Sequence, residues 1–528
     1  MSSQLPDNWE RFILICKPEQ SGKTFIMIQE IINDLRTPVE GKTVINFILC
    51  DNNLLLTKQT CARVSKDLDE FMIGEEIYLE FSSHKRTAYH NAISVAGAIT
   101  TKGIKNILCC TNGKRMDDIY SLISDLNNSE FTQGKLHFKI WLDEADKFTG
   151  FIDTTLKPLV DIYDNIDVYC ITATAKKLFD RYQCMNVLPI ENTTAPEYHG
   201  WEDNIIRTVD IDTRCESFVD HVLTNVAPEK ALPGTKWFIP GRVLKKSHEA
   251  IKNICIEKGF AVFIVNGNGI ILYIPGTREM FTYKKDEEFN IKIKQIYIEK
   301  GLDKYPLAIT GNICIGRGIS IMSNDFMFDF GILSECSNQQ EASQNSGRLK
   351  GNIKHWPSYK KPEVFTTEKF NEVAIEWEIK SRKLAQLAFL KEEQGEKPII
   401  SKSEYKTLGE NYEYIIHPEM FNSFAKAQQF LKTKVRDMKC KVSTSKKGAT
   451  HITTGGYTVT SKLIKPGQTV DDLTDEDRIT YEKSSSISAG SCISSTDKGS
   501  KYLILPVYKD LDTPPNKEMY QVRYIKFN

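Results

Sequence analysis

The sequence predicts an α/β protein with two tandem lobes, each a parallel sheet flanked by helices, followed by a smaller α+β module. Short apolar runs alternate with helical patterns, and buried strands separated by helices are typical of doubly wound parallel sheets. The alternation starts again after a polar break at 190–203. The predicted strands are 12–16, 44–50, 104–110, 137–143 and 167–173 in the first lobe, and 204–212, 236–241, 260–267, 305–311 and 326–333 in the second.

A change of pattern after the second lobe predicts where the remaining segments lie. Charged and apolar residues recur at helical spacing over 370–394, which indicates a connecting helix. After about residue 400, one helical pattern at 421–435 is followed by β-like segments, which indicates a separate α+β module. The predicted segments are 1–200 for the first lobe, 201–365 for the second lobe, 366–400 for the connecting helix and 401–528 for the C-terminal module.

Composition limits the class of protein. The 528 residues are 41% hydrophobic and 26% charged, which are values of globular proteins, and no stretch approaches the length of an apolar spanning helix. The 69 basic and 69 acidic residues balance, so any surface for nucleic acid must be local. The 13 cysteines form no C-x-x-C pair, which argues against a zinc site or a disulfide framework. We expect an intracellular protein in a reducing compartment, without a membrane partner.

A phosphate-binding loop is predicted between the first strand and the first helix. The segment KPEQSGKT (17–24) follows an apolar strand and precedes an apolar helix, which is the context that a phosphate loop requires. A glycine lets the backbone approach phosphates, and the start of a helix offers free N–H groups. The short S-G-K-T segment also occurs in surface turns. The predicted nucleotide-binding residues are Gln20, Ser21, Gly22, Lys23 and Thr24, with Lys23 on the β- and γ-phosphates and the Thr24 hydroxyl on Mg²⁺.

An acidic tetrapeptide supplies the second element of the site. Asp143, Glu144, Ala145 and Asp146 follow the apolar strand 137–143, and carboxylates at the end of such a strand emerge at the ligand-binding edge of an α/β sheet. We expect Asp143 to hold Mg²⁺ and Glu144 to polarise the attacking water. The same tetrapeptide alone is also found at solvated helix starts. The preceding strand and the upstream phosphate loop favour the catalytic interpretation.

With these motifs the sequence resembles the superfamily 2 helicases, including the D-E-A-D group, over roughly residues 10–355. Thr172-Ala173-Thr174-Ala175 is similar to the S-A-T motif of that family, which implies a link between the γ-phosphate site and the strand-binding surface. The resemblance implies two RecA-like P-loop NTPase domains with ATP between them. It also implies an ATP hydrolase that is stimulated by nucleic acid and moves along a strand as the lobes close and reopen.

Two further motifs lie in the second lobe. Residues 307–321 resemble motif V, which implies that Thr310 and Gly311 face nucleic acid and that Gly316 and Arg317 face the nucleotide. Residues 343–351 resemble motif VI, Q-x-x-G-R. An arginine from the opposite lobe stabilises charge on the transferring phosphoryl group only when the cleft is closed. The implied catalytic residues are Lys23, Asp143, Glu144, Gln344 near the γ-phosphate and Arg348 as the arginine finger.

Weaker matches complete a predicted face for nucleic acid. Residues 51–53, 111–115 and 238–242 follow predicted strands and resemble motifs Ia, Ib and IV. Polar and basic groups at strand ends suit phosphate contacts, which position a strand without reading its sequence. Ordinary turn chemistry is the alternative interpretation. The predicted contacts are Asn52, Thr111, Asn112, Arg115, Thr172, Gly241, Arg242, Thr310 and Gly311.

Several positions depart from the family pattern. Lys17 and Gln20 stand where glycines are usual in the phosphate loop, and Ser320 stands where motif V usually has Asp. Asn345 and Gly351 replace arginines of motif VI, so this motif offers no second finger. No glutamine-centred adenine motif precedes the loop. With these departures, the sequence is less similar to the RNA-dedicated D-E-A-D box branch than to DNA-acting members, among them helicases of phages and large DNA viruses. The departures therefore favour DNA over RNA as the partner.

The C-terminal module contains the clearest basic segment of the chain. Ten lysines and arginines lie between Lys426 and Lys465, against Asp437 alone, and Phe430 and Tyr457 are available for stacking. This composition predicts either auxiliary nucleic-acid binding or docking of a protein partner.

We therefore expect an ATP-dependent DNA helicase or translocase that acts in replication, repair or transcription. The alternatives are an RNA helicase, a duplex translocase that does not unwind, and a catalytically weak, ATP-regulated scaffold that binds nucleic acid. Lys17 and Gly351 favour the scaffold, whereas the intact Lys23, Glu144 and Arg348 argue against it.

Overall fold

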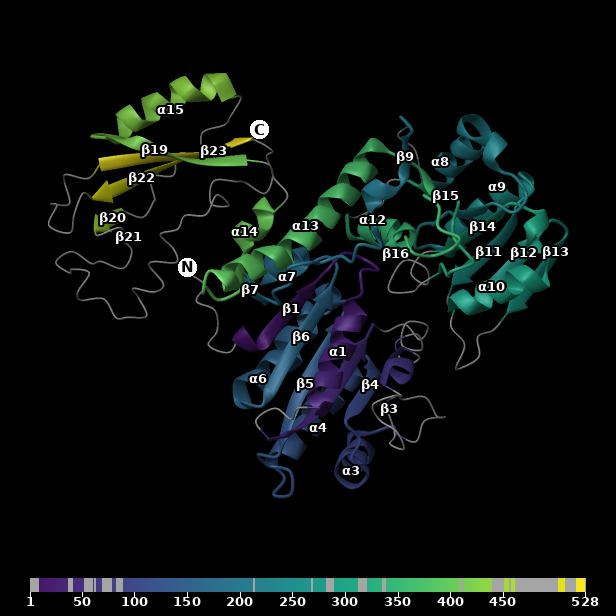
Figure 1. Cartoon of the computed structure of the whole chain (residues 1–528), viewed down its shortest axis with the longest axis horizontal. Coiled ribbons are helices and arrows are strands. Elements are labelled where there is room, and N and C mark those ends of the chain that lie inside the picture. The colour runs from purple at the N-terminus through teal and green to yellow at the C-terminus, as the bar shows by residue number, and fades with distance from the viewer. Residues whose placement is uncertain are drawn as a thin grey trace. The chain divides into compact units, whose positions relative to one another are not determined.

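The computed structural model contains two compact units, residues 1–399 and 400–528. The first unit holds both predicted lobes (Figure 1). The residues that the structure describes are 9–36, 41–51, 60, 63–68, 78–81, 89–211, 214–266, 269–281, 289–311, 321–334, 339–408, 412–438, 451–454, 457–460, 502–508 and 519–527.

The first lobe is an eight-stranded sheet in the order β18-β7-β1-β6-β5-β2-β4-β3. From β7 to β3 every pair of neighbours is parallel. The strands are mainly apolar because helices cover both faces of such a sheet. Their bounds are β1 (Phe12–Cys16), β2 (Thr43–Cys50), β3 (Leu79–Glu80), β4 (Asn106–Cys110), β5 (Leu136–Asp143), β6 (Ile166–Thr172), β7 (Cys184–Val187) and β18 (Ile399–Ser401).

Amphipathic helices cover this sheet. In α1, Met27, Ile28, Ile31 and Ile32 recur at helical spacing and pack on the sheet beside Trp141, while polar residues occupy the other face (Figure 1). Asn91 and Asn112 begin α3 and α4, because each side chain accepts the backbone N–H three residues later. The helices are α1 (Lys23–Arg36), α3 (Ala92–Lys102), α4 (Gly113–Asn128), α5 (Thr149–Phe151), α6 (Lys157–Ile162) and α7 (Lys176–Arg181).

The second lobe is another eight-stranded sheet, in the order β13-β12-β11-β14-β10-β15-β17-β9. Its strands are parallel from β11 to β9, and β12 and β13 add an antiparallel hairpin at one edge. Alternate residues of β11 enter two different apolar clusters, so both faces of the sheet are covered. The strands are β9 (Ile205–Thr208), β10 (Lys236–Phe238), β11 (Ala261–Asn266), β12 (Gly269–Ile274), β13 (Thr277–Phe281), β14 (Leu307–Gly311), β15 (Phe330–Leu333) and β17 (Glu363–Thr366).

One long helix joins elements of both lobes. Helix α13 (Glu368–Glu393) begins at Thr367, whose side chain accepts the Phe370 N–H, and it contacts β1 and β7 of the first sheet and β9 of the second (Figure 1). A two-stranded ladder of β8 (Tyr198–His199) and β16 (Gly351–Asn352) lies within the same unit. The second-lobe helices are α8 (Cys215–His221), α9 (Lys245–Glu257), α10 (Phe289–Glu299) and α12 (Gln339–Ser346).

The C-terminal unit is a five-stranded sheet in the order β19-β23-β22-β20-β21, with helix α15 (Phe424–Met438). Phe430, predicted as a stacking face, packs within the unit, with its ring centroid 4.3 Å from that of His417 and 5.2 Å from that of Phe421. Most of the basic segment and the Tyr457 side chain lie outside the described residues. The other elements are α14 (Lys402–Thr407), β19 (Tyr412–Phe421), β20 (His451–Thr454), β21 (Tyr457–Thr460), β22 (Tyr502–Tyr508) and β23 (Met519–Phe527).

The predicted fold class is confirmed: two tandem, mostly parallel α/β lobes precede an α+β module. Within the described part of the chain, none of the helices is long and apolar enough to cross a bilayer.

Buried side-chain amide groups form hydrogen bonds between strands at the centre of the first sheet. Asn46 on β2 donates to Asn106 Oδ1 at 3.2 Å and accepts the Trp141 indole N–H at 2.9 Å. We expect Asn46→Ala to lower the free energy of unfolding by about 1–3 kcal/mol, because it leaves a buried indole N–H without its acceptor. Thermal and urea unfolding measure this change. Asn225→Ala, on an exposed helix, is the control, and equal losses in the two variants would contradict the prediction.

Candidate active site

The phosphate loop is a tight turn between β1 and α1. The Ser21 hydroxyl donates to the Pro18 carbonyl oxygen at 2.7 Å, which closes the turn on itself. Gln20 and Gly22 both have left-handed backbones, with φ of 58° and 94°. A side chain in this conformation costs roughly 1–2 kcal/mol, so the glycine that is usual at the position of Gln20 has a physical reason. The loop nevertheless closes with glutamine there.

The lysine of the loop lies over the turn. Lys23 Nζ donates to the carbonyl oxygens of Lys17 and Pro18, at 3.3 and 3.1 Å. Its ammonium group is therefore held at the mouth of the loop, where a nucleotide phosphate would compete for it. Burial and the neighbouring Lys23 lower the pKa of Lys17, the unusual residue at the first position of the loop.

Two carboxylates stand at the end of β5. Asp143 is the last residue of that strand, and its Oδ1 accepts the Glu144 backbone N–H at 3.1 Å. Glu144 has a left-handed backbone with φ of 53°. Burial, and next the charge of Glu144, raise the pKa of Asp143 to about 7, while Lys23 opposes this shift. A buried carboxyl group in this setting is stabilised as an anion by a bound cation.

Asp146 was not assigned a role from the sequence, and it links this segment to the next strand. Its carboxylate is buried and accepts the hydroxyls of Thr172 at 2.8 Å and Thr174 at 3.3 Å. These bonds connect the acidic tetrapeptide to the end of β6. The Thr172 side chain, predicted to contact nucleic acid, is buried and bonded within the lobe.

The predicted catalytic residues line one cavity. It has a volume of about 270 Å³ and is lined from the first lobe by the phosphate loop and the end of β5, and from the second by α12 and the segment after it. Ser21 of the described loop was predicted to bind nucleotide as well. Its side chain is buried and does not line this cavity. The predicted residues at the cavity wall are Gln20, Gly22, Lys23, Thr24, Asp143, Glu144, Gln344 and Arg348.

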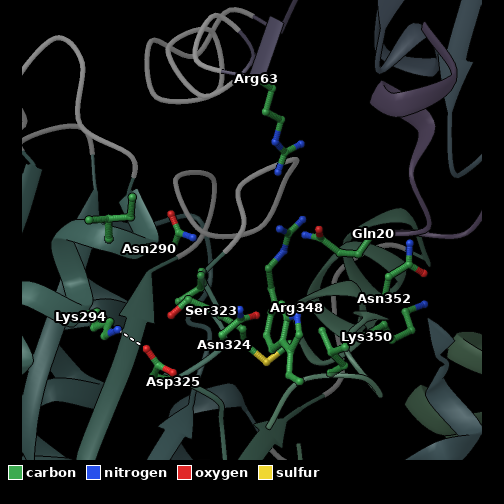
Figure 2. Close-up of a pocket in the computed structure, with 16 residues that line it drawn as sticks. Gln20, Arg63, Asn290, Lys294, Ser323, Asn324, Asp325, Arg348, Lys350 and Asn352 are labelled. Atoms are coloured by element: carbon green, nitrogen blue, oxygen red, sulfur yellow. Dashed lines mark hydrogen bonds and ion pairs between the residues drawn. The ribbon is translucent and has the colours of Figure 1, made fainter. Parts of the chain in front are cut away.

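Arg348 is the buried cation that the second lobe supplies. Burial lowers its pKa to about 10, and the charges of Glu144 and Glu19 oppose that shift, so the guanidinium lies within electrostatic reach of both carboxylates. Figure 2 shows a second cavity, of about 530 Å³, in which Arg348 and Gln20 extend toward each other and Arg63 is directed to the same space; these three residues line both cavities. Arg63 lines the cavity too, and no motif in the sequence indicated it.

At the end of motif VI, glycine stands where the family pattern has arginine, and the backbone conformation there suits glycine. Gly351 has φ of 144°, a conformation that L side chains rarely adopt. A Cβ atom there would lie 3.3 Å from the Gln20 side chain. The backbone thus accommodates glycine at the place where related motifs have an arginine.

The strand-end residues of the first lobe serve the lobe itself. Thr111 is buried and donates its hydroxyl to a backbone carbonyl, and Asn112 caps α4. Arg115, predicted to contact nucleic acid, is only 2% exposed, its guanidinium lies 4.3 Å from the Phe81 ring centroid, and it donates to the His90 carbonyl oxygen at 3.1 Å. Asn52, the remaining prediction for this lobe, lies outside the described residues, as do Gly316 and Arg317 of the second.

In the second lobe, the predicted contacts lie at the ends of β10 and β14. Gly241 donates its N–H to the Gly311 carbonyl oxygen at 2.8 Å, and a Cβ on Gly241 would lie 2.7 Å from His248. Arg242 is exposed and pairs with Glu216 through bonds of 2.8 and 2.9 Å. Thr310 is buried, and its hydroxyl oxygen has no hydrogen-bond partner in the described part of the chain. Arg242 is the accessible group of this set.

The residues present fit a magnesium ion bound together with a nucleotide. Asp143 and Thr24 line the same cavity and are the hard oxygen ligands that Mg²⁺ takes, with phosphates completing its shell. The burial that raises the pKa of Asp143 is the observation that favours a cation there. Within the described residues, no group of three or more His, Cys, Asp or Glu residues is placed to hold a metal by itself.

The fold and the site define a two-lobe α/β protein with a phosphate loop, an acidic strand end and an arginine from the second lobe. No protein-family model matches the chain, and a comparison with curated proteins gives no match. Similar solved structures include the DEAD-box helicase Mss116 bound to ssRNA and UDP-BeF (12% identity, covering 76% of this chain and 84% of that chain, TM-score 0.40).

Two other similar structures bear related descriptions. Dbp5 of S. cerevisiae bound to RNA and ADP BeF3 has 15% identity and a TM-score of 0.40, covering 70% of this chain and 83% of that one. The helicase Lhr of Mycobacterium smegmatis bound to ssDNA and AMP-PNP has 13% identity and a TM-score of 0.35, covering 72% and 46%. The functional conclusion has to come from the site itself.

The raised pKa of Asp143 predicts a pH-dependent stability. Because its folded-state pKa lies near 7, above that of an exposed aspartate, the ionised form destabilises the fold, and stability is lost as pH rises through about 7. In metal-free buffer we therefore expect the Asp143→Asn variant to melt at a higher temperature than wild type between about pH 5 and about pH 8. Added Mg²⁺ should reduce this gain. Asp125→Asn, on an exposed face of α4, is the control, and a gain independent of pH would contradict the prediction.

Proposed function

We propose that this protein is a nucleic-acid-stimulated ATPase that translocates along, or unwinds, its track as superfamily 2 helicases do. One observation carries the proposal: Lys23, Asp143 and Glu144 of the first lobe line the same cavity as Gln344 and Arg348 of the second. A phosphate loop alone would fit many nucleotide-binding proteins. A cavity whose catalytic groups come from two lobes makes hydrolysis depend on their approach.

Each group has a role that its position supports. Lys23, at the mouth of the loop, binds the β- and γ-phosphates, and the start of α1 donates N–H groups to them. Asp143 and Thr24 hold Mg²⁺, which neutralises charge on the phosphates when it is bound. Glu144 accepts a hydrogen bond from the attacking water and orients it. Its left-handed backbone turns it away from the line of β5 into the cavity.

The second lobe completes the site electrostatically. Arg348 is buried, so its charge acts through a medium of low dielectric and is worth more than an exposed arginine. Arginine fingers contribute roughly 10³–10⁵ to the rate of related phosphoryl transfers. Gln344, from the same segment, lines the cavity beside it. Movement of the second lobe would therefore switch hydrolysis on and off.

DNA is the track that we favour, because motif VI lacks the second arginine of the RNA-dedicated branch and the Gly351 backbone accommodates no substitute for it. Arg242, exposed at the end of β10, is the described side chain best placed for phosphate contact. An RNA track, translocation on duplex without unwinding, and an ATP-regulated scaffold remain the alternative outcomes of the test. The C-terminal unit would add nucleic-acid binding or recruit a partner.

The deciding experiment is steady-state ATP hydrolysis at one fixed salt concentration, alone and with single-stranded DNA, duplex DNA or RNA. We expect one polymer to stimulate the wild type, and Glu144→Gln to lose about 10²-fold or more in kcat, since it removes the group that activates water. Glu130→Gln, an exposed carboxylate, is the matched control. Nucleic-acid binding without any hydrolysis would leave the scaffold and contradict the motor.

A further inference from the structure

A buried carboxylate lies inside the phosphate loop. Glu19 is 7% exposed, and three groups from beyond the first sheet bind it. Lys350 Nζ lies 2.8 Å from its Oε2, the Ser343 hydroxyl donates to its Oε1, and the Tyr198 hydroxyl donates to its backbone carbonyl oxygen at 3.0 Å. Both partners of the carboxylate belong to the motif VI region. The loop is therefore bonded directly to the second lobe.

The contact continues into α13. Lys350 Nζ lies 3.3 Å from Glu378 Oε2 as well, and only 1% of the lysine side chain is exposed. Glu378 accepts the Trp201 backbone N–H at 2.8 Å and pairs with Arg382. Two carboxylates and two cations thus form a charge-balanced chain, buried except at Arg382, from the phosphate loop to the helix that contacts both sheets.

Two glycines make this chain sterically feasible. A Cβ on Gly347 would lie 2.7 Å from the Glu19 Cβ, and one on Gly200 would lie 2.3 Å from Glu378 Oε1. Both distances are shorter than real Cβ contacts, so a side chain at either position would displace the carboxylate. The backbone of motif VI approaches the phosphate loop this closely because position 347 is glycine.

A negative charge in a phosphate loop is unfavourable by itself. Phosphates and a bare Glu19 carboxylate repel each other, and burial strengthens that repulsion. Lys350 neutralises the carboxylate only while the second lobe is against the loop, because the lysine belongs to that lobe. Arg348, two residues earlier on the same lobe, lines the cavity together with Glu19.

We propose that Glu19 and Lys350 are a positioning pair that makes the affinity of the loop for nucleotide depend on the second lobe. With Lys350 in place, the loop accepts phosphates. When the lobe withdraws, the exposed charge of Glu19 repels them and promotes release of ADP. The proposal rests on the proposed nucleotide-binding function. It assigns a role to the two charged residues, Glu19 and Lys350, through which the loop and motif VI are in contact.

The test is binding of a fluorescent ADP analogue to the full chain, with Lys350→Met, Glu19→Gln and the double variant. We expect Lys350→Met to weaken binding by about tenfold or more, since an unneutralised like charge in a desolvated site is strongly unfavourable. Glu19→Gln should bind at least as tightly as wild type and release the analogue more slowly. The double variant should recover wild-type affinity, because it carries neither the repelling charge nor its neutraliser.

Recovery in the double variant separates this role from a structural one, in which both single variants and the double would all bind weakly. Lys354→Met, which breaks a partly exposed ion pair of 2.9 Å with Asp203, is the control and should bind as wild type does. Equal affinity of wild type and Lys350→Met, or no recovery in a folded double variant, overturns the proposal. If the wild type binds ADP but does not hydrolyse ATP, only the proposed motor function is contradicted. If it binds no nucleotide, both the motor function and the role of the Glu19–Lys350 pair are contradicted.

Discussion

Parallel pairing in the first sheet is the constraint on which the site depends. In the ladder of β1 with β6, Cys16 lies opposite Thr172, and in that of β5 with β6, Asp143 lies opposite Ile171. These registers bring three strand ends to one edge of the sheet. The phosphate loop, the acidic tetrapeptide and the threonines bonded to Asp146 are therefore neighbours, although up to about 150 residues of chain separate them.

Close approach of backbone to backbone is the second requirement. Gly347 permits motif VI to touch Glu19, and Gly351 turns the chain away beside Gln20. Inside the loop, the tight turn of the backbone is made by Gln20, whose left-handed conformation is strained. The surrounding contacts over-determine this conformation, since Ser21 and Lys23 both bond to the carbonyl oxygen of Pro18.

The sequence was sufficient to predict most of the buried parallel strands and to indicate a set of candidate catalytic residues. Buried parallel strands are mainly apolar runs, so segments such as 44–50 and 137–143 were readable without structure, whereas the β12–β13 hairpin and the short strands β3, β7, β17 and β18 were missed. The candidate catalytic residues were readable because the chemistry proposed for them requires fixed residue types at strand ends. Motif order then brought Gln344 and Arg348 into the set, and both line the predicted cavity.

The partner of a polar side chain was not readable in the same way. Arg115 and Thr172 stand in motifs that suggested exposure, yet the fold buries one over Phe81 and bonds the other to Asp146. Glu19 and Lys350 are separated by 331 positions, and nothing periodic or local marks them as a pair. Burial and long-range partners depend on how the chain packs, which residue patterns alone do not specify.

The segment 348–350 places two buried cations against two carboxylates of the first lobe. Arg348 is within electrostatic reach of Glu144, the residue proposed to orient the water, and Lys350 pairs with Glu19 in the loop proposed to bind the phosphates. Because the two cations belong to one short stretch of backbone, a movement of the second lobe would carry both. Under the two proposals, hydrolysis and nucleotide affinity would both depend on that movement, and the link from Lys350 to Glu378 would extend it to α13, whose contacts reach both sheets.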